Sequence, residues 1–350
     1  MIAGTLAAQI RQNGPLPLPD YMGAVTSAYY AQPNVIGAAG DFITAPEISQ
    51  VFGELIGLWS AVVWQNMGRP AKVRVIECGP GRGTLMNDFL RAAARAPAFL
   101  AAAEVHLVEQ SPTLRAAQLA LLGNRATWHD TIDGVPAGPM ILVGNEFLDA
   151  LPIRQFQKTA SGWMERYVTV DERGNFSFVL KPSEVSNTPA AQPGAIFETS
   201  PAVTAFTAKV AARLMKDGGA ALLFDYGHRV TAAGETLQAL RQHKFCEVFD
   251  SPGQCDLTAH VDFAAVAGAA RSAGAAVYGA IEQGVWLNRL GIKLRGLQLA
   301  KGKSPEIARE IESGIRRLIE PDAMGALFKV IAITDPKLPR PEGFLPEDEP

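Results

Sequence analysis

One stretch, residues 73–85, limits what this chain can fold into more than any other. It reads Val-Arg-Val-Ile-Glu-Cys-Gly-Pro-Gly-Arg-Gly-Thr-Leu, so a short apolar run leads into Gly79, Gly81 and Gly83. Residues 84–94 then have the pattern of a helix. A strand, a glycine turn and a helix begin a βαβ unit, in which a nucleotide-like ligand lies over the turn. Glycine allows positive φ and leaves no Cβ between the backbone and that ligand.

The spacing of the glycines separates two classes of ligand. A dinucleotide site reads G-x-G-x-x-G, and its third glycine falls where this chain has Thr84. Counted from Glu77, the chain instead has an acid followed by three alternating glycines, which resembles class I S-adenosylmethionine (SAM) methyltransferases. The resemblance implies that Glu77 meets the methionine end of SAM and that the glycines pass under its sulfonium and ribose. A plain tight turn also fits the glycines alone. Arg82 is a further candidate, as a partner of the SAM carboxylate or of Glu77.

Two more acids follow predicted strands. Residues 105–109 are a short strand ending in Glu109, at the place where such folds hold a ribose diol with a carboxylate. Asp130 follows the next strand, and either accepts from the adenine amine or is a surface loop acid. The glycine turn and the strand that ends in Glu109 together favour SAM over NAD.

Six separated blocks resemble one family. In chain order they are residues 40–50, 77–85, 108–112, 145–152, 225–228 and 256–263. They closely resemble the MidA family, whose mitochondrial members are protein arginine methyltransferases that assist respiratory complex I assembly. The resemblance runs from about residue 1 to 335, with Cys78 a small departure where Leu is the more usual residue. It implies methyl transfer from SAM, with S-adenosyl-L-homocysteine as product, to a protein client that is a complex I subunit.

Strand and helix patterns alternate through most of the chain and predict a class I, Rossmann-like, seven-stranded doubly wound sheet. The resemblance implies that the seventh strand, at 327–334, is antiparallel and lies between the fifth and the sixth. We expect an N-terminal helical lid at 1–70 and a SAM-binding domain at 71–335. Antiparallel strands and loops form insertions at about 153–194 and 229–260, and a Pro-rich extended tail follows at 336–350.

The segment before the glycine turn carries three lid candidates, Asp41, Thr44 and Glu47. Residues 47–65 predict a strong helix, and Thr44 with Glu47 three residues later fits a capping box. Either these residues cap the helix, or their loop closes over SAM or the substrate. Both roles are compatible, because a capped helix presents its N-terminal loop rigidly.

The acceptor side is expected after strand four. Many N-methyltransferases hold the acceptor nitrogen there, and the chain has Asn145, Glu146 and Asp149 at that place. Carboxylates anchor a guanidinium and receive the proton that it loses. The alternative is that Asp149 caps the next segment and Glu146 is a solvated loop acid. Asp225 and His228 end strand five at the same mouth, and His228 is a general base or a structural histidine.

Composition limits the function classes. The chain has 350 residues, 48% hydrophobic and 19% charged, with a formal net charge of −3, and gives no electrostatic case for nucleic acid. Its three cysteines have no CxxC spacing, and no His/Cys/Asp spacing argues for a metal. No apolar run reaches the ~18 residues of a membrane span. We expect no direct membrane insertion, no signal or transit peptide and a bacterial cytoplasmic location, and the sequence leaves a homodimer open.

The sequence therefore carries three hypotheses about function. The first is a SAM-dependent protein methyltransferase, whose arginine acceptor and complex I client follow only from the resemblance. The second is a SAM-binding assembly chaperone with little turnover, for which the two insertions offer a docking surface. The acids Glu146 and Asp149 argue against it, since a pure binder has no need of them. An NAD-dependent enzyme is the third, and Thr84 argues against that.

Overall fold

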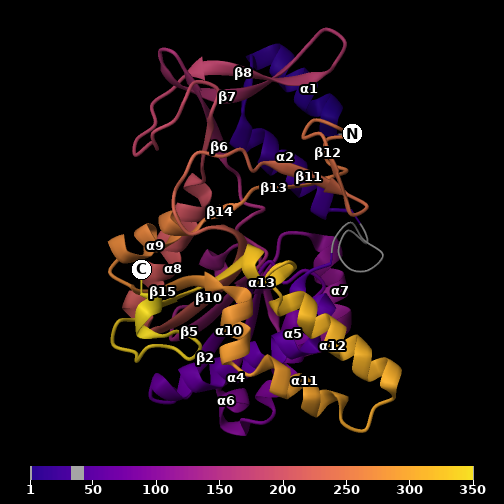
Figure 1. Ribbon diagram of the computed structural model, residues 1–350, viewed down its shortest axis with the longest axis vertical. Helices are drawn as coiled ribbons and strands as arrows, with labels where there is room; N and C mark the ends of the chain where they lie inside the picture. The colour runs from indigo at the N-terminus through magenta and orange to yellow at the C-terminus, as the bar shows by residue number, and fades with distance from the viewer. Residues whose placement is uncertain (1, 33–42, 350) are drawn as a thin grey trace.

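The computed structural model describes residues 2–32 and 43–349 in two packed parts, which lie one above the other in Figure 1. The lower part is a large mixed sheet between helices. The upper part contains two small antiparallel sheets together with helices α1 and α2. The described helices are α1 (Ile2–Asn13), α2 (Leu18–Tyr30), α3 (Ala45–Ile48), α4 (Gln50–Asn66), α5 (Thr84–Ala93), α6 (Pro97–Ala102), α7 (Pro112–Leu122), α8 (Pro201–Asp217), α9 (Phe263–Ser272), α10 (Gln283–Arg289), α11 (Ile292–Ala300), α12 (Pro305–Ile319) and α13 (Met324–Leu327).

The large sheet has the strand order expected from the resemblance. In spatial order its path is β15 (Ala276–Glu282), β16 (Phe328–Thr334), β10 (Gly219–His228), β5 (Met140–Asn145), β2 (Val73–Cys78), β3 (Ala103–Val108) and β4 (Thr127–His129), and the short β14 (Val261–Asp262) also pairs with β10. The pairs from β10 to β4 are parallel, and β16 is antiparallel to both of its neighbours. The predicted seven-stranded sheet with an antiparallel seventh strand is thus confirmed.

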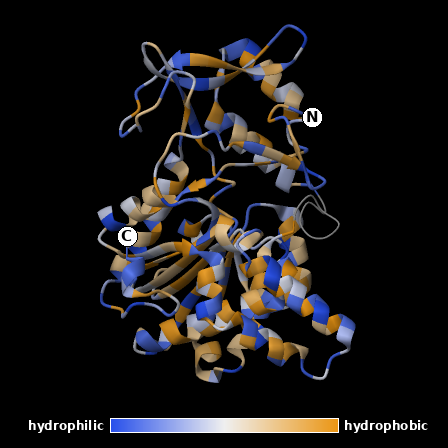
Figure 2. Cartoon of the chain, viewed as in Figure 1, coloured by the Kyte–Doolittle hydropathy of each residue, from blue (hydrophilic) through white to orange (hydrophobic). Residues whose placement is uncertain are grey.

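Both faces of this sheet are buried, which explains why its strands read as continuous apolar runs. Along β10, Ala220, Leu222 and Phe224 face one core, while Ala221 and Leu223 face the other. Helices α4, α5, α10 and α12 contribute to the first core, and α8 and α9 to the second. In Figure 2 the strands of the large sheet are mostly orange, whereas the outer helices alternate between blue and orange.

Helix α4 belongs to the first core of the sheet, so the 1–70 stretch does not pack as one lid. The predicted helix 47–65 is divided at Ser49, which is extended and caps α4 by accepting from the Val51 N–H. Two glycines on α4 let α5 approach closely. A Cβ on Gly53 would lie 2.9 Å from the Leu85 carbonyl oxygen, and one on Gly57 would lie 2.6 Å from that of Phe89.

The two expected insertions supply most strands of the upper sheets, and β1 from the N-terminal stretch and β9, just beyond the first insertion, complete the first of them. The first sheet contains β1 (Leu16–Pro17), β6 (Arg154–Thr159), β7 (Gly162–Val170), β8 (Phe176–Pro182) and β9 (Ile196–Thr199); the second contains β11 (Gln238–Arg241), β12 (Lys244–Cys246) and β13 (Asp256–Thr258). They share a third core with α1 and α2, which includes Leu18, Tyr21 and Leu257. Helices α1 and α2 therefore pack on the insertions, and α4 packs on the large sheet.

The C-terminal segment packs against the large-sheet part. Phe344 is 4% exposed and contacts the rings of Tyr278 and Trp286, and the Trp59 indole N–H donates to the Glu342 carbonyl oxygen at 3.1 Å. This segment is not the extended tail that its prolines suggested. Across residues 2–32 and 43–349, none of the helices combines the length and apolar character needed to cross a membrane.

Candidate active site

A cavity of about 710 Å³ opens at the carboxyl ends of β2, β3 and β5. This is where open α/β sheets bind ligands, beside the switch in strand order. Its wall draws on distant segments of the chain, including α2, the glycine turn, the loop after β3, the loop after β5 and α8. The expected site residues in the wall are Thr44, Glu47, Glu77, Gly79, Gly81, Glu109, Asp130, Asn145 and Glu146.

The glycine turn forms one side of the cavity. Gly79 and Gly81 have φ of +64° and +53°, and a Cβ on Gly79 would lie 3.0 Å from the Phe147 ring. Gly83, with φ of +85°, is the N-cap of α5 and packs against Gln118 rather than in the wall. Glu77 ends β2, is 3% exposed, and its Oε2 has no hydrogen-bond partner among the described residues. Burial, followed by repulsion from Glu109, raises the pKa of Glu77 to about 8.

Glu109 lies beside the glycine turn and is fixed by its neighbours. Its Oε1 accepts from the Ser111 N–H at 2.8 Å, and its Oε2 accepts from the Gln118 amide at 3.3 Å. The same Gln118 amide donates to the Gly81 carbonyl oxygen at 2.7 Å, so Gln118 connects Glu109 to the glycine turn. Burial raises the pKa of Glu109. Asp130 is 82% exposed in its side chain and pairs with Arg115, so it lies at the rim.

The loop after β5 presents Glu146 to the cavity. Glu146 has φ of +51°, a conformation that is uncommon for a residue with a side chain. Its Oε1 accepts from the Ala45 N–H and from the Asn145 amide, both at 3.0 Å, and both donors are uncharged. Burial, then the nearby Asp149, raises the pKa of Glu146 to about 7.

Three expected site residues lie behind the wall that the described residues form. Asp149 is 6% exposed, and its pKa is raised to about 6, mainly by burial. Asp225 is completely buried and accepts N–H groups of the loop after β5, so its carboxylate is not free for a substrate. His228 points to Asp262, with Nε2 3.9 Å from Oδ2. The sequence placed Asp225 and His228 correctly at the end of a strand. Strand pairing, however, directs their side chains away from the cavity.

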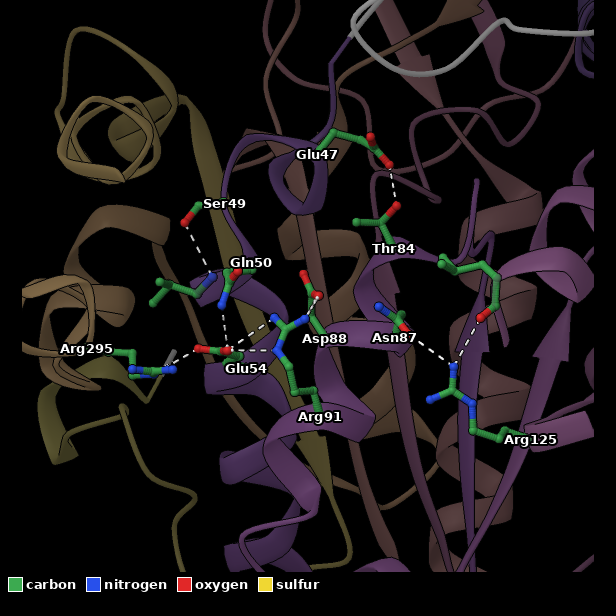
Figure 3. A network of polar contacts seen from close by, with 12 residues as sticks. Glu47, Ser49, Gln50, Glu54, Thr84, Asn87, Asp88, Arg91, Arg125 and Arg295 are labelled. Atoms are coloured by element: carbon green, nitrogen blue, oxygen red, sulfur yellow. Dashed lines mark hydrogen bonds and ion pairs between the residues drawn. The ribbon is translucent and has the colours of Figure 1, made fainter. Parts of the chain in front are cut away.

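The capping box expected at Thr44 and Glu47 does not form. Thr44 is the N-cap of α3 but makes no side-chain capping bond. Glu47 instead accepts from the Thr84 hydroxyl at the start of α5 (Figure 3). It also lies 3.7 Å from the Arg82 guanidinium. Helix α3 is thereby attached to the glycine turn. Asp41 lies outside the described residues.

A second polar network lies deeper in the same region. Figure 3 shows Glu54 of α4 between Arg91 of α5 and Arg295 of α11, and both arginines donate to its carboxylate, at 3.1 and 2.8 Å. Glu54 is 3% exposed, so the ion pairs connect three helices behind the site instead of lining it.

Comparison with known proteins decides the chemistry of this cavity. The model of a family of S-adenosyl-L-methionine-dependent methyltransferases matches residues 55–281. The chain belongs to this family. It is a SAM-dependent methyltransferase of the MidA type, and SAM is its cofactor.

Relatives of this methyltransferase share nearly the whole chain. The mitochondrial protein arginine methyltransferase NDUFAF7 homolog of Drosophila melanogaster is 35% identical, over 95% of this chain and 84% of its own. The human mitochondrial protein arginine methyltransferase NDUFAF7 is 33% identical, over 94% and 82%. A crystal structure from Burkholderia thailandensis with bound S-adenosyl-homocysteine is 31% identical, with a TM-score of 0.85 over 98% of this chain and 93% of that one.

The residues of this methyltransferase suit SAM at the cavity. The unpartnered Glu77 carboxylate suits an ammonium group, and Glu109 keeps lone pairs for a ribose diol. The position of Gly79 leaves no room for a side chain between the turn and Phe147. When bound, SAM supplies a methyl group on a sulfonium.

Sequence reasoning missed three residues that build this site. Gln118 connects Glu109 to the turn, and Tyr30 and Ser111 join α2 to α7 through a 2.6 Å bond from the serine hydroxyl to the tyrosine carbonyl. Gln118 left one signal, since it lies four residues from both Leu114 and Leu122 on the buried face of its helix. The contact between Tyr30 and Ser111 left none, because it depends on the packing of α2 against α7.

Proposed function

We propose that this methyltransferase methylates an arginine side chain of a protein client, and that the client is a subunit of respiratory complex I. The observation that supports an arginine acceptor is a group of three acids around the loop after β5, of which Glu146 is half-buried and the other two are buried. Glu146 is in the cavity wall with two uncharged hydrogen-bond donors, and Asp149 and Asp225 lie behind it. Buried acids without an adjacent cation favour a cationic ligand. The names of the relatives support arginine as that cation.

In this proposal Glu146 is the catalytic carboxylate. The ionised side chain holds the guanidinium through N–H groups and directs one nitrogen toward the cofactor. The N–C bond would form as the methyl–sulfur bond of SAM breaks, with S-adenosyl-L-homocysteine as the leaving group. The attacking nitrogen loses one proton, and Glu146 takes it. Asn145 fixes the Glu146 side chain, and Asp149 adds negative charge beneath it. Glu77, Gly79, Gly81 and Glu109 hold the cofactor, with Asp130 at the rim.

The wider setting of the reaction is also a proposal. We place the protein in a bacterial cytoplasm, without direct membrane insertion and without nucleic acid as a partner. Thr44 and Glu47 of the N-terminal stretch border the acceptor side of the cavity. The insertions around 153–194 and 229–260 provide the surface that the client contacts, and a homodimer is compatible with this arrangement.

The variant Glu146→Gln tests the acceptor role. We expect SAM binding by titration calorimetry within about twofold of wild type, and transfer of labelled methyl groups into an extract of cells lacking this protein reduced by ~100-fold or more. Acid hydrolysis of the labelled client should release methylarginine. Glu306→Gln is the matched control, because Glu306 is 70% exposed on α12.

Rising pH should increase the wild-type transfer rate through about pH 7, because the pKa of Glu146 is raised to about 7 and only the ionised form accepts a proton. The Glu146→Gln variant should lack this step. Wild-type turnover in that variant would remove Glu146 from the mechanism. Label on another residue type would exclude arginine. A wild-type protein that binds SAM and the client but transfers no label would be the assembly chaperone of the second hypothesis.

A further inference from the structure

Asp225 is a buried acid for which the proposed reaction has no direct use. It is 0% exposed, at the carboxyl end of β10, and therefore meets neither solvent nor a substrate. Its surroundings are unfavourable for a charge. Burial, followed by repulsion from Asp149 and Glu146, raises the pKa of Asp225 well above its ordinary range. A carboxyl group in such a place requires strong compensation from hydrogen bonds.

That compensation comes from one turn of the chain. The Asp225 Oδ2 atom accepts from the N–H groups of Phe147, Leu148 and Asp149, at 3.2, 2.9 and 3.2 Å. Its Oδ1 atom accepts from the Tyr226 N–H at 3.0 Å. Successive N–H groups that converge in this way form a backbone nest, which binds an anion. Because both Asp225 oxygens accept N–H groups, this carboxyl group occupies a nest made by the loop after β5.

The same turn determines where Glu146 points. Glu146 comes directly before the three N–H groups and has φ of +51°. A left-handed conformation at a residue with a side chain persists only when the surrounding structure fixes it. The Glu146 N–H donates to the Phe224 carbonyl oxygen at 2.9 Å, so bonds to the end of β10 hold both sides of this residue.

Neighbours of Asp225 extend the support to the next acid. The Tyr226 hydroxyl donates to the Thr258 hydroxyl of β13 at 2.6 Å. The Asp149 carbonyl oxygen accepts from the Ala259 N–H at 3.1 Å. The motifs 225–228 and 256–263 have no direct role in the proposed reaction. Their hydrogen bonds support the loop after β5.

We infer that Asp225 is a positioning residue for methyl transfer: its carboxylate holds the loop after β5 in the conformation that directs Glu146 into the cavity. The inference rests on the proposed role of Glu146. Asp225 acts through the loop and touches neither cofactor nor acceptor.

Hydrogen exchange tests the nest without any substrate. In Asp225→Ala, and in Asp225→Asn as the milder change, amides of a peptide covering residues 146–152 should exchange ~10- to 100-fold faster, because three N–H groups lose a charged acceptor. The peptide covering residues 79–86 should be unchanged. The matched control is Asp335→Asn. Asp335 is also a buried acid that accepts one backbone N–H, from Lys337 at 3.0 Å, but it lies at the opposite end of β10.

Binding separates positioning from general support. SAM affinity of Asp225→Asn should remain within about twofold of wild type, while affinity of the S-adenosyl-homocysteine complex for N-acetyl-arginine amide should fall by ~10-fold or more. In transfer assays kcat should fall at an unchanged KM for SAM. The Asp335→Asn variant should change neither affinity.

Each outcome decides one point. Wild-type exchange at 146–152 in the Asp225 variants would overturn the nest. Faster exchange with unchanged binding of the arginine probe and unchanged kcat would overturn the positioning role. If Asp225→Ala does not fold, Asp225→Asn gives the same readouts. If the wild type itself does not bind the probe, kcat on the labelled client tests Asp225, and the labelled residue in that client decides whether arginine is the acceptor.

Discussion

Individual carboxylates in this protein are placed at a cost to stability where they serve ligands. Glu77 is the clearest case, since its Oε2 is buried without a partner among the described residues. Its pKa rises from an ordinary 4.5 to about 8, first through burial and then through Glu109. A raised pKa in the folded state means that folding favours the protonated acid. This contribution to stability is complete below pH 4.5 and is lost as pH rises through about 8.

Replacing Glu77 by Gln should therefore stabilise the ligand-free protein and weaken cofactor binding. The melting temperature of Glu77→Gln should exceed that of wild type at pH 9, and the difference should shrink toward pH 5, because the variant cannot ionise. SAM affinity should fall by ~10- to 100-fold through the loss of a charged partner. Thermal melts across this pH range and titration calorimetry measure both effects. A variant less stable than wild type at pH 9 would show that the Glu77 charge is compensated in the free protein.

At this scale the sequence predicted which residues would line the cavity where that place follows from local position. Glu77, Gly79, Gly81 and Glu109 each lie at or just after the carboxyl end of a strand, and parallel strands bring these ends to one edge. The capping box at Glu47 was wrong because a capping pattern is local, whereas the Thr84 hydroxyl that Glu47 contacts belongs to another helix. Packing partners of this kind leave little trace in sequence.

Pairs of elements, rather than single helices, support the glycine turn. Helix α5 begins at the turn and packs against α4 through Gly53 and Gly57, where even a Cβ would meet the α5 backbone. The periodic apolar stripe predicted α4 as a helix. The stripe could not predict on which part of the fold this helix packs, because the spacing of α4 and α5 depends on these two glycines.

The variant Gly57→Ala should separate these helices and lower the free energy of unfolding by ~1–3 kcal/mol, as overpacking does. Gly268→Ala is the matched control. Gly268 also lies within a helix, α9, but no atom lies within 4 Å of its Cβ position, so alanine should raise stability by ~0.5–1 kcal/mol. Urea unfolding of the three proteins gives the comparison. Equal effects of the two substitutions would show that α4 can move away from α5 without loss.

The whole molecule holds together through segments distant in sequence. Alternating strands and helices were enough to predict the class of fold, and the resemblance to class I methyltransferases supplied the order of the sheet. The attachment of α1 and α2 to the insertions could not be predicted, because the alternation of elements does not indicate which part of the chain an amphipathic helix covers. The C-terminal segment was misjudged because prolines exclude regular structure but not packing, and Phe344 fills a site between Tyr278 and Trp286.

Truncating the Phe344 side chain should measure what this segment contributes. Phe344→Ala should lower the free energy of unfolding by ~3–5 kcal/mol, because a large buried ring is lost. The adjacent Leu345→Ala should change it by ~0.5 kcal/mol or less, since Leu345 is 41% exposed. Denaturant unfolding monitored by tryptophan fluorescence tests both, since Trp286 contacts the ring. A small effect of Phe344→Ala would mean that the C-terminal segment detaches readily.

The position of β16 also governs the order of events during synthesis. This strand lies between β10 and β15, yet it is made after both of them. About 100 residues separate the end of β10 from the start of β16. At ~5–20 residues per second, their synthesis takes roughly 5–20 s, and during this time β10 lacks its partner β16. Until β16 is made, β10 and β15 each have an open edge that a neighbouring nascent chain can pair with. A premature stop between β15 and β16 would thus release chains that carry every proposed catalytic residue but lack a closed sheet.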